Sequence, residues 1–345
     1  MKLYFIGAGA TRADYSQAPL GDDLLVQALQ LQGREVLNKT CMVRDFLQTF
    51  FNFSDALPRL EDVLAFVDFS LSQQNIVHSS YGHEEFQNVK GALVSLISQL
   101  LEESLRGESS LHCGRDLCNL AIKNKSVIVS TNYDISIDNN IRRLKRSIDY
   151  GFKIRSAGEL ISEPETIGST EFVHKFEKNN QVPCVQQNTI VPLYKIHGSL
   201  NWLYCPRCDE IDLTTWQKGV IFFMKHEQMV HCQNPYCTEF YRDLLVTPTY
   251  FKSYNNRILK SIWEKSERAL SKATEVVFVG YSLPDADVTI RCLLVRGLAR
   301  NYQRPKITVV DRSPTNSDVH VRYRRLFGEV EYLAMDLRQY LDSRL

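Results

Sequence analysis

Five short runs of apolar residues, each followed by polar residues or glycine, stand out along the chain. They occupy residues 3–6, 127–129, 193–196, 276–279 and 307–310. Continuous apolar runs of this length are typical of strands that are buried on both faces. Helical spacing covers residues 256–273, before the fourth run, and residues 285–300, between the fourth and the fifth. This alternation predicts an α/β fold, with a parallel sheet covered by helices on both faces.

The region that follows the first run has a different pattern. The run leads into Gly7-Ala8-Gly9-Ala10, and helical spacing at residues 22–32, closed by Gly33, predicts a strand, a glycine turn and a helix. Residues 34–118 are predicted to be mainly helical. Their clearest element is residues 84–106, where apolar positions recur every three or four residues, and we favour a core position for it over a contact between protomers. Residues 151–191 show little periodicity and are predicted to be irregular.

Composition and charge narrow the range of functions. The 345 residues are 44% apolar and 23% charged, and 41 Lys and Arg against 40 Asp and Glu leave a net charge of +1. No global field favours nucleic acid or an anionic membrane, so we expect no direct nucleic-acid binding. The basic residues 142–146 are interpreted as a solvated helix face. The first apolar run is too short for a signal sequence and no later run reaches the ~18 residues of a membrane span, which predicts a cytoplasmic protein.

Nine cysteines direct attention to metal binding, because a disulfide framework is unlikely in the cytosol. Cys205 and Cys208 form one close pair, and Cys232 and Cys237 form a second pair, with 23 residues between Cys208 and Cys232. Four thiols in two pairs are what tetrahedral Zn²⁺ requires, and they leave no open coordination position, so the metal would be structural. The alternatives are free buried thiols, or a site in which a nearby histidine at position 226 or 231 replaces one cysteine.

Polar residues follow three of the predicted strands. Thr131-Asn132-Tyr133-Asp134 comes after the second run, His197 after the third, and Gly280-Tyr281-Ser282 after the fourth. Parallel sheets hold ligands at the carboxyl ends of their strands, so these residues are candidates for one crevice. His197 is either a general base or a structural histidine. Asn132 and Asp134 are either catalytic groups or residues that form a turn or cap the next helix.

Gly7-Ala8-Gly9 is a weak signal by itself. Glycines allow a ligand to approach the backbone closely, and a pyrophosphate is one such ligand. The third glycine of a dinucleotide fingerprint is replaced by Arg12. A tight strand-to-helix turn without any ligand is an equally good interpretation.

The order of these motifs is more specific than any one of them. The chain contains, in sequence, Gly7-Ala8-Gly9-Ala10, Thr131-Asn132-Tyr133-Asp134, His197-Gly198, the two cysteine pairs, Gly280-Tyr281-Ser282-Leu283 and Val309-Val310-Asp311. In this order the chain resembles the sirtuin family over nearly its whole length. Within that family, the segments around Asn132 and Gly280 look like the bacterial sirtuin-like proteins that destroy NAD during phage defence.

The resemblance implies a fold, a ligand and a set of site residues. The fold is a Rossmann-like parallel sheet with a helical insertion at residues 34–118 and a small zinc-ribbon-like module at residues 200–245. The ligand is NAD⁺, as a substrate. Its pyrophosphate would lie along Gly7, Ala8 and Gly9, with Thr131 also in the binding site. Gly280, Ser282 and Asp311 would contact the adenosine half, and Asn132, Asp134 and His197 would line the nicotinamide and its ribose.

Departures from the deacylase pattern decide between activities. Residues 17–22 keep a proline but lack the aromatic residue and the arginine that deacylases usually carry there, and the deacylase Gln-Asn-Ile-Asp is Thr131-Asn132-Tyr133-Asp134 here. These changes favour an NAD⁺ glycohydrolase with Asn132, His197 and Asp134 as catalytic residues, acting in anti-phage defence by NAD depletion. The alternatives are a protein-lysine deacylase and a non-catalytic NAD or ADP-ribose sensor. Such a protein would depend on a homo-oligomer or on a separately encoded ATPase or nucleic-acid-guided activator.

Overall fold

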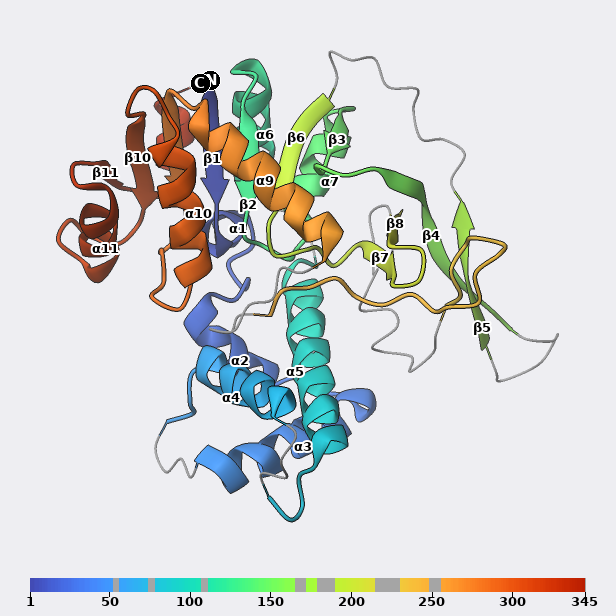
Figure 1. The fold of residues 1–345 in the computed structure, drawn as a ribbon. Helices are drawn as coiled ribbons and strands as arrows, with labels where there is room; N and C mark the ends of the chain where they lie inside the picture. Colours follow the sequence, from blue (N-terminus) through green and yellow to red (C-terminus); the bar gives the residue numbers. More distant parts are fainter. Residues whose placement is uncertain are drawn as a thin grey trace.

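The fold is taken from a computed structural model, which describes residues 1–51, 56–73, 78–106, 111–164, 172–178, 190–214, 230–247 and 256–344. Its centre is a seven-stranded sheet in the order β11-β10-β9-β1-β2-β6-β3 (Figure 1). The strands are β1 (Lys2–Ile6), β2 (Val127–Ser130), β3 (Ser147–Asp149), β6 (Ile190–Lys195), β9 (Glu275–Val279), β10 (Lys306–Asp311) and β11 (Glu331–Ala334). Every neighbouring pair is parallel. The five predicted strands and the parallel sheet are therefore confirmed.

The connections of the sheet change direction beside β1. From β1 the chain continues to β2, β3 and β6 on one side, and it then crosses to β9, β10 and β11 on the other. The reversal lies between β1 and β9, where open α/β sheets bind their ligands outside the carboxyl ends of the strands. Gly7 and Gly280 follow these two strands directly, so the topology brings two of the predicted motifs together.

Helices cover both faces of the sheet, as the alternating pattern predicts. In the view of Figure 1, α9 (Arg257–Ser271) and α10 (Val288–Ala299) lie packed together in front of the sheet. A second group forms around α6 (Cys113–Lys123), which contacts α1 (Ala8–Asp14), α7 (Ser136–Arg143) and α12 (Leu337–Asp342). The helix α11 (Asp318–Phe327) precedes β11. Both groups join one hydrophobic core with the strands.

A helical unit with a separate hydrophobic cluster lies below the sheet in Figure 1. It contains a 3₁₀ turn, η1 (Gly21–Asp23), and the helices α2 (Leu24–Ala28), α3 (Arg34–Phe51), α4 (Leu60–Ser72) and α5 (His83–Ser104). The helix predicted at residues 84–106 is α5, and its apolar face forms the centre of this cluster. The boundaries of the insertion, residues 34–118, stay a prediction.

The predicted beginning of the chain is wrong in two details. The helix α1 begins within the glycine motif, at Ala8, instead of after a turn. The helix expected at residues 22–32 ends at Ala28, because the next backbone bonds, from Gln30 N to Gln27 O and from Leu31 N to Ala28 O, reach back only three residues. The shorter helix packs against α5.

The prediction that residues 151–191 are irregular is also wrong in part. A second sheet in the order β5-β4-β8-β7 contains β4 (Ile154–Pro164), β5 (Phe172–Lys178), β7 (Trp202–Cys205) and β8 (Glu210–Thr214). A register irregularity between Ile154 and Ser156 allows the adjacent Arg155 and Ser156 both to contact Asp212. Because these polar residues interrupt the alternation of apolar and polar positions, hydrophobic periodicity does not reveal β4 in the sequence. Residues 165–171 and 179–189 lie outside the described part of the chain.

Among the described residues, no helix combines the length and the apolar character that crossing a membrane requires.

Candidate active site

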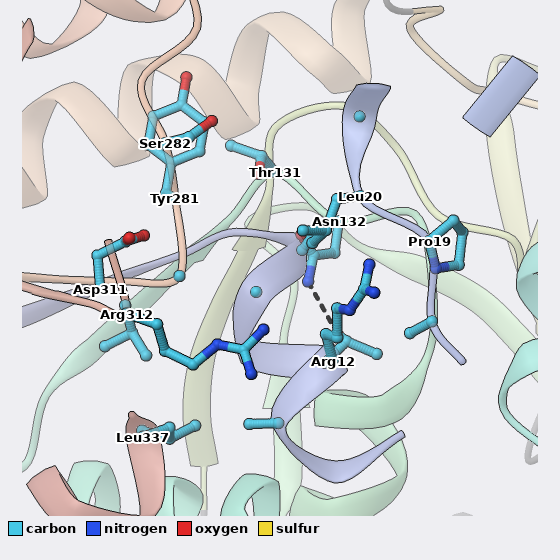
Figure 2. Close-up of a pocket in the computed structure, with 18 of the residues that line it drawn as sticks. Arg12, Pro19, Leu20, Thr131, Asn132, Tyr281, Ser282, Asp311, Arg312 and Leu337 are labelled. Carbon is cyan, nitrogen blue, oxygen red and sulfur yellow. Dashed lines mark hydrogen bonds between the residues drawn. The ribbon is translucent and has the colours of Figure 1, made fainter. Parts of the chain in front are cut away.

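A cavity of about 870 Å³ opens at the carboxyl ends of the parallel strands. Figure 2 shows Thr131 and Asn132 from the end of β2 facing it on one side, with Tyr281, Ser282 and Asp311 from the ends of β9 and β10 on the other. The volume is within the range of small-molecule and cofactor sites. Of the site residues predicted from the sequence, Ala8, Gly9, Thr131, Asn132, Asp134, His197, Gly280, Ser282 and Asp311 line this cavity, and Gly7 adjoins it.

The two glycine motifs pack directly against each other at the back of the cavity. Gly9 N donates to Gly280 O at 2.9 Å, and Gly7 N donates to Val279 O at 3.0 Å. A Cβ on Gly7 would lie 2.6 Å from Gly280 O, and a Cβ on Gly9 would lie 2.8 Å from Gly280 Cα. The crossing of two backbones therefore explains why Gly7 and Gly9 are glycines, without reference to a ligand.

Asn132 is held with its carboxamide in a fixed orientation. Its Nδ2 donates to Gly7 O at 3.1 Å and to Thr11 Oγ1 at 3.0 Å. Because the carbonyl of Gly7 only accepts, the amide nitrogen must be the atom on that side. Oδ1 accepts no hydrogen bond from the described residues, so it is the atom that remains for a molecule in the cavity.

Asp134 lies behind Asn132 and is engaged through both oxygens. Its Oδ2 accepts from Thr11 Oγ1 at 3.0 Å, and its Oδ1 accepts from Ser136 N at 2.9 Å at the start of α7. Burial raises the pKa of this carboxyl, while the ammonium of Lys195 and the two hydrogen bonds act in the opposite direction. The N-cap position of α7 is Ile135, so the bond from Ser136 N to Asp134 closes the turn that leads into this helix. Thr11 links Asp134 to Asn132 through its hydroxyl.

Lys195 is a buried cation that holds the turn containing Asp134. The side chain of Lys195 is 1% exposed, and Nζ lies 3.1 Å from Asp138 Oδ2, whose own side chain is fully buried. Nζ also donates to the carbonyl of Asp134. Tyr150 donates from its hydroxyl to the other oxygen of Asp138. A buried ion pair of this kind fixes the backbone from residue 133 to residue 138.

His197 is buried at the end of β6 and lies beside Tyr133. Its Nδ1 is 3.2 Å from Thr131 O, and because a carbonyl accepts, Nδ1 carries the proton of the neutral ring and Nε2 is its basic atom. The rings of Tyr133 and His197 are stacked, with centroids 6.0 Å apart. The hydroxyl of Tyr133 donates to Val246 O. Next to it, Gly198 has φ +86°, and a Cβ there would collide with Leu244 O.

The opposite end of the cavity is formed by β9, β10 and α11. Asp311 Oδ1 accepts from Ser313 N at 2.8 Å, which orders the turn after β10. Figure 2 shows Arg12 close to Pro19, Leu20 and Asn132, and Arg312 extending from the end of β10 into the cavity. Arg12 pairs with Asp23 at 3.0 Å. Sequence reasoning did not assign a binding role to either arginine, although Arg12 interrupts the glycine fingerprint and Arg312 follows a predicted site residue.

The helical unit also contributes to the cavity wall. Arg59 and Glu61 at the start of α4 line it, together with Leu101, Ser104 and Leu105 near the end of α5. The site is therefore shared between the parallel sheet and the helical unit.

The four cysteines of the two predicted pairs come together outside this cavity, beside β7 and β8. The Sγ atoms of Cys205, Cys208, Cys232 and Cys237 all lie within 4.8 Å of one another, with 3.7 Å between Cys205 and Cys237 and 3.8 Å between Cys208 and Cys232. Tetrahedral zinc with Zn–S bonds of about 2.3 Å requires sulfur–sulfur distances of about 3.8 Å. The thiols therefore fit a structural zinc ion. Of the alternative ligands, His231 is exposed and turned to Thr238 O, and residue 226 lies outside the described residues.

Donors around the thiols favour the thiolate form that a metal needs. Arg155 lies 3.1 Å from Cys232 Sγ and also contacts Asp212, and Asn234 Nδ2 lies 3.4 Å from Cys208 Sγ. Hydrogen bonds and cationic charge near the sulfurs compensate the negative charge of four thiolates. Arg155 belongs to β4, so it also links the cysteine cluster to the second sheet.

The fold is an open α/β fold with a cavity at the switch point of its parallel sheet, where such folds bind their ligands. A family model described as a SIR2-like domain matches residues 126–327, more than half of the chain. The chain therefore belongs to the SIR2-like family, and its fold is the sirtuin-like Rossmann fold.

The solved structures that are similar to this chain include three Sir2 complexes. A Sir2 homologue in complex with NAD is 12% identical with a TM-score of 0.47, over 99% of this chain and 87% of the other. A mutant Sir2 homologue in complex with ADP-ribose is 11% identical with a TM-score of 0.48, over 99% and 89%. Sir2 bound to an acetylated peptide is 12% identical with a TM-score of 0.45, over 99% and 91%. No curated protein matches the sequence.

Proposed function

We propose that this protein is an NAD⁺ glycohydrolase, which cleaves the bond between nicotinamide and ribose and releases nicotinamide and ADP-ribose. The observation that supports this function best is that Asn132 and His197 both line the cavity and are each held in one orientation by hydrogen bonds. Asn132 presents Oδ1, and His197 carries its basic atom on Nε2. Two neutral polar groups suit a reaction that passes through an oxocarbenium-like state and needs no strong nucleophile.

The reaction balances with water as the only co-reactant. Nicotinamide leaves with the electron pair of the C–N bond as a neutral molecule, water forms the new C–O bond, and one proton is released. Asn132 Oδ1 accepts a hydrogen bond from a ribose hydroxyl or from the water and orients it. His197 Nε2 takes the proton, a step that typically contributes 10²–10⁴-fold. Asp134 acts through Thr11, by holding the Asn132 amide.

The binding assignments use residues that line the cavity. Ala8, Gly9 and Thr131 are among them, and we assign them, with the adjoining Gly7, to the pyrophosphate and its neighbourhood. Ser282 and Asp311 lie across the cavity from Asn132 in Figure 2, and we assign them, together with Gly280, to the adenosine half. We assign Cys205, Cys208, Cys232 and Cys237 to a structural zinc ion within the module predicted at residues 200–245.

Tyr133 supports hydrolysis over deacylation. Its ring covers one side of His197, and its hydroxyl is tied to the carbonyl of Val246. The deacylase pattern has isoleucine at this position, so the larger tyrosine ring beside His197 is a departure at the nicotinamide end of the site. Deacylation remains the second candidate because the four-cysteine cluster matches the module typical of deacylating sirtuins, and a non-catalytic NAD or ADP-ribose sensor is the third.

The cellular role is a further part of the proposal. The resemblance of the segments around Asn132 and Gly280 to NAD-destroying bacterial proteins favours anti-phage defence by NAD depletion. Uncontrolled hydrolysis of NAD⁺ would harm the host, so activity would be controlled by homo-oligomerisation or by a separately encoded ATPase or nucleic-acid-guided activator.

The assay is release of nicotinamide from NAD⁺ by the full chain and by two single variants. Asn132→Ala removes the orienting amide and His197→Ala removes the base, so each is expected to lower turnover at least 100-fold. A matched control is Asn301→Ala, which removes another carboxamide with backbone partners, those of Leu270 and Ala273, outside the cavity. Turnover by the Asn132 or His197 variant at the parent rate would refute the assignment.

A further inference from the structure

Two arginines lie at the end of the cavity that we assign to adenosine, and neither forms an ion pair with the described residues. Arg312 is exposed and forms no ion pair or hydrogen bond with the described residues, and Figure 2 shows its side chain extending into the cavity beside Asp311. Arg322, on α11, also lines the cavity and donates from Nε to Ser282 O at 3.0 Å. This bond occupies one donor of its guanidinium and leaves the other nitrogens available.

The acidic groups nearby are already engaged. Asp285 pairs with Arg291 at 2.5 Å, and Asp287 accepts from the hydroxyl of Tyr281 at 2.7 Å. Asp311 uses Oδ1 to accept from Ser313 N. The positive charge of Arg312 and Arg322 is therefore not cancelled by a direct ion pair within the described residues.

An unpaired guanidinium facing a cavity suits a phosphate, because its planar fork of donors matches phosphate oxygens. In nucleotide-binding α/β sheets, an acidic side chain at the ribose recognises a free 2′-hydroxyl, and an arginine near it accommodates a 2′-phosphate. This chain has both in succession, Asp311 and then Arg312, at the end of one strand. The hydroxyls of Ser282 and Ser313 add neutral donors at the same end of the cavity.

We propose that the cavity accepts the 2′-phosphorylated dinucleotide NADP⁺ as well as NAD⁺, with Arg312 and Arg322 contacting the 2′-phosphate. The inference rests on the proposed function, because it assigns the adenosine end of the same site. It extends the substrate class, since the bond that is cleaved lies at the other end of the molecule and its chemistry is unchanged. Arg312 has one competing role, which is contact with the pyrophosphate that both dinucleotides share.

Binding of two uncleavable ligands separates these roles. The affinities of ADP-ribose and of 2′-phospho-ADP-ribose are measured by calorimetry for the parent protein and for Arg312→Gln and Arg322→Gln. The parent is expected to bind the phosphorylated ligand at least as tightly as ADP-ribose. Arg312→Gln is expected to lower the affinity for 2′-phospho-ADP-ribose about 10- to 100-fold and to change the affinity for ADP-ribose less than about 3-fold. The loss should shrink as salt is raised, because ionic contacts at an exposed site are screened.

Control variants keep the experiment decisive. Arg296→Gln removes an arginine that is 65% exposed and lies on α10 outside the cavity lining, so it should leave both affinities unchanged. Arg312→Lys retains the positive charge but loses the planar guanidinium. It should therefore bind 2′-phospho-ADP-ribose more tightly than Arg312→Gln does, but less tightly than the parent protein. Because Arg312 is exposed, its variants should unfold at the parent temperature, which circular dichroism checks.

Each contrary outcome has a distinct meaning. Equal weakening of both ligands by Arg312→Gln would place Arg312 at the pyrophosphate and overturn the inference. Binding of ADP-ribose with rejection of its 2′-phosphate would overturn the inference and leave the proposed NAD⁺ site intact. Binding of neither ligand by the parent would contradict both. Since neither ligand contains the nicotinamide bond, absence of turnover in another assay would not affect these results.

Discussion

Replacement of Thr11 by valine tests whether the Asp134–Thr11–Asn132 relay orients the amide that acts on the substrate. The Thr11 hydroxyl accepts from Asn132 Nδ2 at 3.0 Å and donates to Asp134 Oδ2 at 3.0 Å, and the side chain is 6% exposed. Valine has nearly the same shape but neither donates nor accepts. The variant therefore breaks both bonds while changing the packing little.

The expected losses of stability and turnover follow from the two groups that lose a hydrogen-bond partner. The Asp134 carboxylate loses one hydrogen bond, worth about 1.5–3 kcal/mol for a charged group, and the Asn132 amide loses one of its two, at about 1–3 kcal/mol if it stays buried and unpaired. Together we expect the free energy of unfolding to fall by about 2.5–6 kcal/mol. With only the bond to Gly7 left, Asn132 can rotate, and we expect turnover to fall about 10- to 100-fold, equivalent to about 1.4–2.8 kcal/mol of barrier.

The assay compares nicotinamide release by Thr11→Val with release by Thr11→Ser, at a temperature where both variants are folded. Serine keeps the hydroxyl, so Thr11→Ser should retain activity within about 3-fold of the parent. The mechanism predicts that Thr11→Val lowers kcat more than it raises KM, because the relay affects orientation of Asn132 during the reaction. Equal kcat values for the valine and serine variants would refute the role of the relay.

Three further predictions concern the Lys195–Asp138 ion pair, the cysteine cluster and the carboxyl group of Asp134. Lys195→Met should lower the free energy of unfolding, measured in urea, by about 3–5 kcal/mol, because it leaves the charge of Asp138 buried without its cation. Adding Asp138→Asn should recover part of that loss. If the losses of the two single variants simply added in the double variant, the ion-pair account would be contradicted. Cys205→Ser should reduce bound zinc from about one equivalent to almost none by elemental analysis, while Cys41→Ser, an exposed cysteine outside the cluster, should not. Burial raises the pKa of Asp134 above its ordinary 3.8, so its contribution to stability should decrease as the pH rises from 3.8 through the raised pKa. Unfolding followed against pH should show a smaller slope in that window for Asp134→Asn, and an unchanged slope would contradict the assignment.

The parallel sheet was predictable because its strands are buried on both faces. The runs that became β1, β2, β6, β9 and β10 are apolar except for Lys195 and Thr308 and are followed by polar residues or glycine, so local sequence is sufficient to locate them. The edge strands β3 and β11 are short and half-exposed and carry no such pattern. The strand β4 was missed because its position depends on pairing with β5 and β8 and on the polar contact of Arg155 with Asp212.

Candidate site residues were predictable where chemistry follows a strand end. Asn132 and His197 could be selected for this reason, and the structure brings both to one cavity. Thr11 could not, because its partner Asp134 is 123 residues away and only the parallel pairing of β1 with β2 joins them. Lys195 gave a weaker signal, as a lysine within an apolar run, but its role depends on Asp138, 57 residues earlier.

Product analysis tests the central claim most directly. Purified protein, with and without an acylated lysine peptide, is incubated with NAD⁺, and all products are identified by mass spectrometry. Hydrolysis predicts equal amounts of nicotinamide and ADP-ribose without peptide, at a rate that the peptide does not raise. NAD⁺ consumption that requires the peptide and yields O-acyl-ADP-ribose would contradict the glycohydrolase assignment and establish deacylation.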